Sequence, residues 1–219
     1  MVFYHLLTFG ESPFGTVPSI IIENIMAANS NFSKLVKSNP LVGFRWLEAV
    51  NMIKWMTHSD HARRPSPDQL VNDIFFKNAE ERKTILIAAN DVLNNPSAEV
   101  KAQANEVVAN EIVPKIKVMQ KYLPDAKIPS FENWNAQLNP SYLEAMTHSK
   151  TGEHKYGFKE LGQLFRLIRN TLAHFAEIAA KKGVKKVFGG VTLEEYIQYI
   201  NGQFPWLLIF AQTIIDQAK

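Results

Sequence analysis

The sequence has no cysteine among its 219 residues. Disulfide bonds, thiolate metal sites and cysteine nucleophiles are therefore excluded, and the absence fits a reducing compartment such as the cytoplasm. Long hydrophobic runs are also absent, since residues 204–215 are interrupted by Pro205, Gln212 and Thr213 and are shorter than the roughly 20 residues of a membrane-spanning helix. Residues 1–10 have no basic leader or small-residue cleavage site, so we expect neither a secretory signal nor a membrane segment.

Positive charge is concentrated in one part of the chain. The formal net charge is only +3, but residues 150–190 hold nine lysines and arginines against three glutamates. That segment carries +6 and the remainder −3. A local excess of this size attracts a polyanion such as the phosphate backbone of a nucleic acid, although a solvated lysine-rich face gives the same pattern.

Helical periodicity dominates the sequence, and no segment alternates in the way typical of a strand. We therefore predict an all-α fold. Ser66 followed by Pro67, and Thr192 followed by Glu195, have the pattern of helix starts. The expected helices cover residues 2–9, 18–28, 44–57, 67–73, 77–94, 97–122, 140–148, 157–181, 192–201 and 204–217.

Two short motifs mark residues 1–76. Residues 7–15 read LTFGESPFG, and residues 64–67, RPSP, are followed by IFF at residues 74–76. In this order and spacing they resemble the last part of a protein-kinase C-lobe. The glycine-rich loop, strand lysine and catalytic aspartate motifs of kinases are missing from the sequence. We expect no kinase activity and interpret residues 1–76 as a docking platform. The resemblance pairs Arg64 with a glutamate upstream of Met1, so here Arg64 either has another partner or is solvated.

The expected helix 157–181 is strongly amphipathic. A rotation of about 100° per residue places Leu161, Leu164, Ile168, Leu172 and Phe175 on its apolar face, and Lys159, Gln163, Arg166, Asn170 and His174 on its polar face, with Arg169 at the flank. Arg166, Asn170 and His174 follow one another at i, i+4 spacing. A guanidinium, an amide and an imidazole therefore form one column.

This column contains the groups that RNA cleavage requires. Attack of a ribose 2′-hydroxyl on its own phosphate needs a base, an acid for the leaving oxygen and donors for the developing charge. Imidazole titrates near neutral pH and guanidinium binds phosphate bidentately. No metal ion or other cofactor is needed. A histidine on a polar helix face is also an ordinary surface feature, so the column alone leaves both interpretations open.

A longer signature surrounds the column. Tyr156-Gly157 is followed by an apolar stretch and by Ile168-Arg169-Asn170 and His174, with PSFENW at residues 129–134 upstream and residues 196–208 downstream. With this spacing, residues 77–219 resemble the kinase-extension nuclease domain of ribonuclease L and of the unfolded-protein-response sensor kinases. The implied fold is all-α, with a partial kinase C-lobe, residues 1–76, packed on an α-helical nuclease domain, residues 77–219.

The resemblance implies a role for each matching residue. His174 is the expected general acid, Tyr156 a base or a phosphate donor, and Arg169 with Asn170 the clamp on the scissile phosphate. The implied activity is that of a metal-independent endoribonuclease, acting as a homodimer on single-stranded or loop RNA and leaving a 2′,3′-cyclic phosphate. Alternatively, Tyr156 is a packing residue at the helix start.

Further contacts with RNA are expected from Trp134, Gln163, Arg166, Lys159 and Lys155. For Trp134 a core or interface aromatic is the alternative. Gln163 stands where relatives commonly carry an acidic residue, and an amide lacks the charge that orients a neighbouring arginine. The alternative function is therefore a catalytically inactive relative that binds RNA or a kinase-like partner. A further hypothesis is that the chain is part of a longer sensor with an upstream kinase-like or ligand-recognising domain.

The Gln163→Asp variant tests whether the site has decayed from an active ancestor. If the missing carboxylate is essential, this variant cleaves a labelled RNA much faster than the parent protein, because the new charge orients the neighbouring arginine. The initial cleavage rates of the two proteins are compared. An unchanged rate contradicts decay and leaves either intact activity or a pure binding role.

Overall fold

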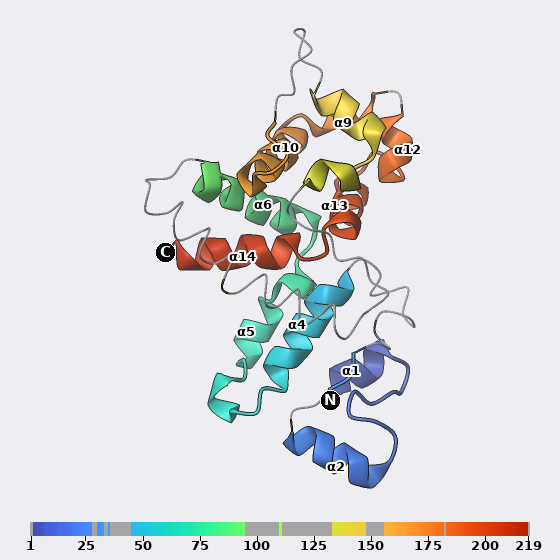
Figure 1. Ribbon diagram of the computed structural model, residues 1–219, viewed down its shortest axis with the longest axis vertical. Coiled ribbons are helices and arrows are strands. Elements are labelled where there is room, and N and C mark those ends of the chain that lie inside the picture. The colour runs from blue at the N-terminus through green and yellow to red at the C-terminus, as the bar shows by residue number, and fades with distance from the viewer. Residues whose placement is uncertain are drawn as a thin grey trace. The chain divides into compact units, whose positions relative to one another are not determined.

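The computed structural model describes residues 2–27, 30–32, 35, 45–94, 110, 133–147, 156–181 and 183–218. These residues form α-helices and short 3-10 helices and contain no strand, so the all-α prediction is confirmed (Figure 1). They fall into two compact units, one up to Lys77 and one from Asn78 onward. The predicted helix 97–122, apart from Asn110, lies outside the described residues. None of the described helices combines the length and apolar character needed to cross a membrane.

The first unit is built around α4, which is buried on most of its sides. Leu47, Val50 and Ile53 of this helix are buried, and the helix contacts η3. Near the start of the chain the buried rings of Tyr4 and Phe32 pack edge to face, with centroids 5.9 Å apart. The elements of the unit are α1 (Val2–Leu7), α2 (Pro18–Met26), α4 (Trp46–Met56), η2 (His61–Arg63), α5 (Pro67–Val71) and η3 (Ile74–Phe76).

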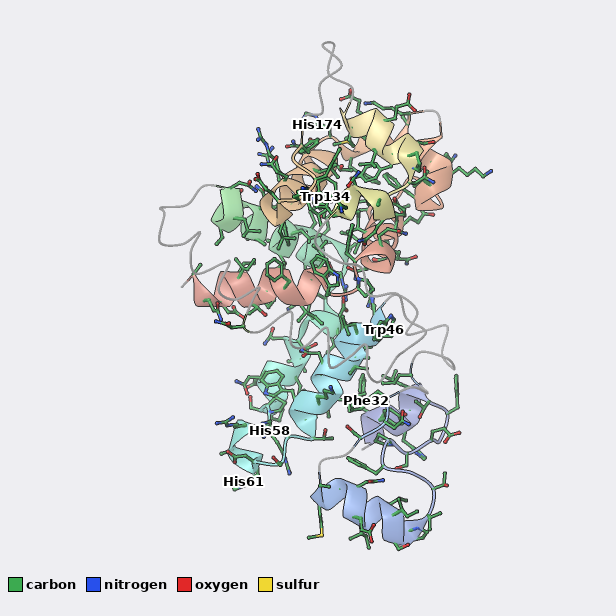
Figure 2. The ribbon with its side chains drawn as sticks, in the orientation of Figure 1. Phe32, Trp46, His58, His61, Trp134 and His174 are labelled. Atoms are coloured by element: carbon green, nitrogen blue, oxygen red, sulfur yellow. The ribbon has the colours of Figure 1, made fainter. Side chains whose placement is uncertain are left out.

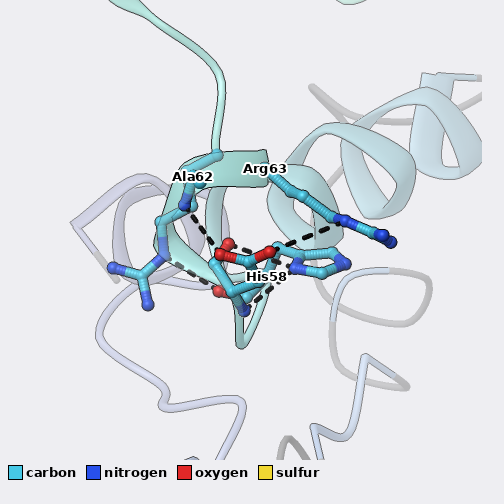
Figure 3. A network of polar contacts seen from close by, with 5 residues as sticks. His58, Ala62 and Arg63 are labelled. Carbon is cyan, nitrogen blue, oxygen red and sulfur yellow. Dashed lines mark hydrogen bonds and ion pairs between the residues drawn. The ribbon is translucent and has the colours of Figure 1, made fainter.

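A polar turn between α4 and α5 gives Arg64 a partner within the chain (Figure 3). Arg64 Nε donates to the carbonyl of His58 at 2.9 Å. Asp60 caps η2 by accepting from Ala62 N at 3.0 Å, and its other carboxylate oxygen lies 3.7 Å from Arg63 Nε. Of the two alternatives for Arg64, the structure therefore shows another partner, a backbone carbonyl.

Both helix starts expected from the sequence are capping boxes. Ser66 Oγ accepts from Gln69 N at 3.2 Å while Gln69 Oε1 accepts from Ser66 N at 2.8 Å. Thr192 and Glu195 exchange the same pair of hydrogen bonds at 2.8 and 3.3 Å. Each box satisfies two backbone N–H groups at a helix end, which is why these two sequence signals locate α5 and α13 correctly.

The second unit is centred on α6, which contacts α10, α13 and α14. Leu164, Leu167 and Ile168 of α10 are fully buried, and each such side chain contributes roughly 1.5–3 kcal/mol. The elements of the unit are α6 (Ala79–Asn94), η5 (Trp134–Gln137), α9 (Pro140–Thr147), α10 (Leu161–Ala173), α11 (Phe175–Ala179), α12 (Val184–Phe188), α13 (Leu193–Gln203) and α14 (Leu207–Gln217).

The first turn of α10 lies against the last turn of α6. Asn94 Nδ2 donates to the carbonyl of Gly162 at 2.8 Å, and a Cβ atom at position 162 would lie 3.2 Å from Asn94 Oδ1. Glycine at this position allows the two helices to approach closely. Further along α10, the buried ring of Phe165 packs on Phe210 of α14 at 5.8 Å.

The expectation of one helix over residues 157–181 is wrong. Helix α10 begins only at Leu161, and His174, with φ −116° and ψ 29°, separates it from α11. The turn redirects the chain so that the ring of Phe175 stacks on Phe188 at 6.4 Å and lies 5.8 Å from Tyr196. We attribute the break at His174 to this packing of Phe175 against residues beyond the helix. Helical periodicity within residues 157–181 does not reveal such contacts.

A chain of buried hydroxyl groups joins α9, α10 and α13. Tyr142 OH lies 2.7 Å from Thr171 Oγ1 and 3.0 Å from Tyr196 OH, and Thr171 Oγ1 donates to the Leu167 carbonyl at 3.0 Å. Because a carbonyl only accepts, this bond makes Tyr142 the donor to Thr171 and Tyr196 the donor to Tyr142. Burial raises the pKa of both tyrosines, so both phenols stay protonated.

The Tyr142→Phe variant removes the middle hydroxyl of this chain. We expect the free energy of unfolding to fall by about 1–3 kcal/mol, because the buried Tyr196 hydroxyl loses its acceptor. Urea unfolding followed by circular dichroism measures the change. Tyr199→Phe is the matched control, since it removes only one bond, from Asn139 N at 2.9 Å near the surface. Equal losses for the two variants would contradict the directional chain.

Candidate active site

A cavity of about 340 Å³ lies between α9, α10 and α11. Its polar lining comes from Tyr156, Asn170, His174, Glu177 and Lys181. Its apolar lining comes from Ala145, Met146 and Ile178. The volume falls within the range of roughly 300–1,000 Å³ typical of small-molecule sites, and the mixture of an apolar surface with a few polar groups is typical as well.

Three of the four predicted catalytic residues line this cavity, and the fourth, Arg169, is hydrogen-bonded to one of them. Asn170 Nδ2 donates to Tyr156 OH at 3.0 Å. Arg169 Nη1 in turn donates to Asn170 Oδ1 at 3.3 Å. The two bonds fix the Asn170 amide with its nitrogen toward the phenol and its oxygen toward the guanidinium. Tyr156 precedes α10 and is almost fully buried, and its hydroxyl thus meets the polar column of that helix.

His174 occupies the turn between α10 and α11 and is well exposed (Figure 2). Its Nδ1 lies 4.0 Å from Glu177 Oε2, and the exposed fractions of the two side chains are 66% and 76%. This separation is longer than a hydrogen bond, so the contact is a loose one between two exposed groups. The break in the helix places this imidazole at the mouth of the cavity, while the backbone N–H of His174 still donates to the Asn170 carbonyl at 3.2 Å.

Trp134 lies in the core and does not line the cavity. Its side chain is fully buried, its Nε1 donates to the Glu160 carbonyl at 3.2 Å, and its ring packs edge to face on Phe158 at 5.4 Å. Trp134 therefore anchors the segment that leads from Tyr156 into α10. Of the two interpretations made from the sequence, the structure agrees with Trp134 as a core aromatic. The role of Trp134 in RNA binding remains a prediction.

The other expected RNA contacts are spread around the start of α10. Lys159 and Arg166 are exposed and Gln163 is half-buried, and none of the three lines the cavity. Gln163 is held at the helix start, where its backbone N–H donates to the Glu160 carbonyl at 3.1 Å. Lys155 lies outside the described residues. The roles of these four side chains as RNA contacts remain predictions.

Sequence reasoning missed Glu177, Lys181 and the apolar surface of the cavity. A signal for them was present, because Glu177, Ile178 and Lys181 follow His174 at spacings of three, four and seven residues, which place them on one side of a helix. Lys181 Nζ donates to the Ala145 carbonyl at 3.0 Å, which draws its ammonium group to the cavity. Met146 and Ala145 come from α9, and no local pattern relates that helix to α10.

Across the described parts of the chain, no group of three histidine, aspartate or glutamate side chains is arranged to hold a metal ion. The cavity instead combines an imidazole, a phenol, an amide and an ammonium group, with a guanidinium one hydrogen bond away. These groups can transfer protons and donate hydrogen bonds to a phosphate. The arrangement is suited to acid–base chemistry on a phosphodiester.

Comparison with known proteins agrees with this chemistry. The model of the family Ribonuclease 2-5A matches residues 91–219. The probable serine/threonine-protein kinase irlB of Dictyostelium discoideum is 27% identical over 97% of this chain and 14% of that protein. The inactive serine/threonine-protein kinase/endoribonuclease IRE1-like of Arabidopsis thaliana is 28% identical over 97% of this chain and 35% of that protein. The serine/threonine-protein kinase/endoribonuclease IRE1 of Oryza sativa subsp. japonica is 24% identical over 99% of this chain and 20% of that protein.

The chain spans between 14% and 35% of the lengths of these relatives. The family model, by contrast, covers more than half of the chain and includes α9 to α14, and thus every residue that lines the cavity. The protein belongs to the ribonuclease 2-5A family, and its second unit contains a kinase-extension nuclease domain.

Proposed function

We propose that the protein is a metal-independent endoribonuclease whose active site is the cavity between α9, α10 and α11. The observation that carries the proposal is the meeting of Tyr156, Asn170 and His174 in that one cavity. Tyr156 and His174 are separated by most of α10, and a plain surface histidine would not share a cavity with a hydrogen-bonded phenol and amide. Family membership supports ribonuclease chemistry for the same residues.

In the proposed mechanism the ribose 2′-hydroxyl attacks the adjacent phosphorus and the 5′-oxygen of the next nucleotide leaves. His174 gives its proton to that leaving oxygen. Tyr156 either accepts the proton of the attacking hydroxyl or donates a hydrogen bond to the phosphate, in which case that proton passes to water. The product then ends in a 2′,3′-cyclic phosphate, because the new bond to the 2′-oxygen is retained when the 5′-oxygen departs.

Arg169 and Asn170 are the proposed clamp on the scissile phosphate. In the free protein the guanidinium donates to the Asn170 oxygen and the amide nitrogen donates to Tyr156. Donors positioned before the substrate arrives stabilise the charge of the pentacoordinate transition state without further reorganisation. A phosphate oxygen would take the place of the Asn170 oxygen as the acceptor of the Arg169 proton.

We further propose that the active form is a homodimer acting on single-stranded or loop RNA, and that residues 1–76 have no kinase activity. The lack of the kinase sequence motifs supports the second statement. Trp134, through the segment that it anchors, and the exposed Lys159 and Arg166 beside α10 are proposed to support RNA binding. Lys155 and Gln163 belong to the same proposed surface.

A catalytically inactive relative is the second candidate. Gln163 in place of an acidic residue favours it, and one of the similar proteins is named as an inactive kinase/endoribonuclease. In that case the cavity and the basic residues around it would bind RNA without cutting it. The two candidates differ only in the chemical step, so a cleavage assay separates them.

The His174→Ala variant removes the proposed general acid. We expect the rate of cleavage of a fluorophore-labelled single-stranded RNA in EDTA to fall by at least about 100-fold, while the thermal unfolding temperature stays unchanged because the side chain is exposed. His61→Ala is the matched control, since His61 is also exposed and lies in the first unit. Parental cleavage rates for His174→Ala would overturn the mechanism.

The same assay tests the proposed dimer. If two chains form the active species, the rate rises more steeply than linearly with protein concentration until dimerisation saturates. A strictly linear dependence from nanomolar concentrations upward would contradict the dimer. No cleavage at any concentration, together with retained RNA binding, would favour the inactive relative.

A further inference from the structure

The cavity extends beyond the proposed catalytic groups toward Lys181. His174, Ile178 and Lys181 stand on one side of α11 and the turn that follows it, and all three line the cavity. Lys181 follows His174 by seven residues, and α11 (Phe175–Ala179) lies between them. The proposed acid and the ammonium group are therefore placed at different points along the same cavity.

The ammonium group of Lys181 is held at the cavity by the protein itself. Its Nζ donates to the carbonyl of Ala145, at the end of α9, at 3.0 Å. An ammonium group has three protons, so this bond positions the charge and still allows bonds to phosphate oxygens. The acidic side chain of the cavity, Glu177, lies beside His174 at 4.0 Å.

The cavity that His174 and Lys181 share is also lined by apolar groups. Met146 and Ile178 are side chains of the facing helices α9 and α11. An apolar surface next to a cation suits a nucleoside with its phosphate, because the base and sugar bury apolar area while the phosphate is paired. A methionine side chain also adapts its shape to a flat ring.

We propose that Lys181 binds the first phosphate on the 3′ side of the cleaved bond, and that the intervening nucleoside rests on Met146 and Ile178. This inference rests on the proposed function. His174 is there the donor to the 5′-oxygen of the leaving nucleotide, so the cavity beyond His174 holds that nucleotide. The next charge along the RNA is its 3′ phosphate, and among the described residues that line the cavity Lys181 is the lysine or arginine.

The experiment uses two trinucleotides that differ only in this phosphate. Both carry a 2′-O-methyl group on the second nucleoside, which confines the cut to the first linkage. One has two ordinary phosphates, and the other has an uncharged methylphosphonate at the second linkage. For the parent protein we expect the methylphosphonate to lower kcat/KM by about tenfold, because a charged hydrogen bond is lost.

The Lys181→Met variant is expected to cut both trinucleotides at the same low rate, since its side chain no longer distinguishes a charged phosphate from a neutral one. Lys181→Arg, which keeps a cation, should restore the difference. Lys83→Met is the matched control, because Lys83 lies on α6 beside Glu80 at 3.2 Å and does not line the cavity. Thermal unfolding of each variant verifies the fold.

The proposal would be overturned if the ratio of kcat/KM for the two trinucleotides is the same in Lys181→Met as in the parent protein. Failure of the parent protein to cut either trinucleotide would instead contradict the proposed function. The role of Lys181 is still tested in that case by a binding assay. The same two trinucleotides are made with 2′-deoxyribose at the first nucleoside, which removes the attacking hydroxyl, and their dissociation constants are measured. If the ratio of the dissociation constants of the two trinucleotides is the same for the parent and for Lys181→Met, the proposed contact between Lys181 and the phosphate is wrong.

Discussion

The packing of α10 against α6 is the contact on which the candidate site depends. One face of α10 is buried through Leu164, Leu167 and Ile168, and the bond from Asn94 to Gly162 fixes its first turn. Once this face is buried, the orientation of the opposite face is determined, because a helix is a rigid rotational frame. This geometry presents Asn170 and Arg169, and the hydrogen bond from Asn170 Nδ2 to the buried Tyr156 hydroxyl ties that face to the core.

The chain of buried hydroxyl groups fixes the position of α9 relative to α10. Tyr142 of α9 is hydrogen-bonded both to Thr171, the next residue after Asn170, and to Tyr196 of α13. The bonds therefore fix α9 relative to α10 at the level of the cavity, where α9 contributes Ala145 and Met146. Buried polar groups are costly when unpaired, so this chain disfavours a shift of α9 along α10 that an apolar interface alone would tolerate.

Positive charge around the site has a more specific distribution than the sequence indicates. Residues 150–190 are basic as a whole, but among the lysines and arginines that the structure describes there, Lys181 lines the cavity, and Arg169 reaches it through Asn170. Lys159 and Arg166 are exposed elsewhere on the same unit. The basic segment thus divides into charges at the cavity and charges exposed elsewhere on the unit, and exposed charges of one sign attract polyanions at long range.

The sequence by itself determined the all-α class, the starts of α5 and α13, and the faces of α10, because capping and helical periodicity are local properties. It also indicated the four proposed catalytic residues, through a motif whose spacing is independent of the fold. Only the tertiary structure decided the break at His174, the burial of Trp134, and the place of Met146 and the Ala145 carbonyl beside Lys181 at the cavity. These depend on contacts between segments far apart in the chain, such as Phe175 with Phe188 and Lys181 with Ala145, and such contacts leave no periodic trace in either segment.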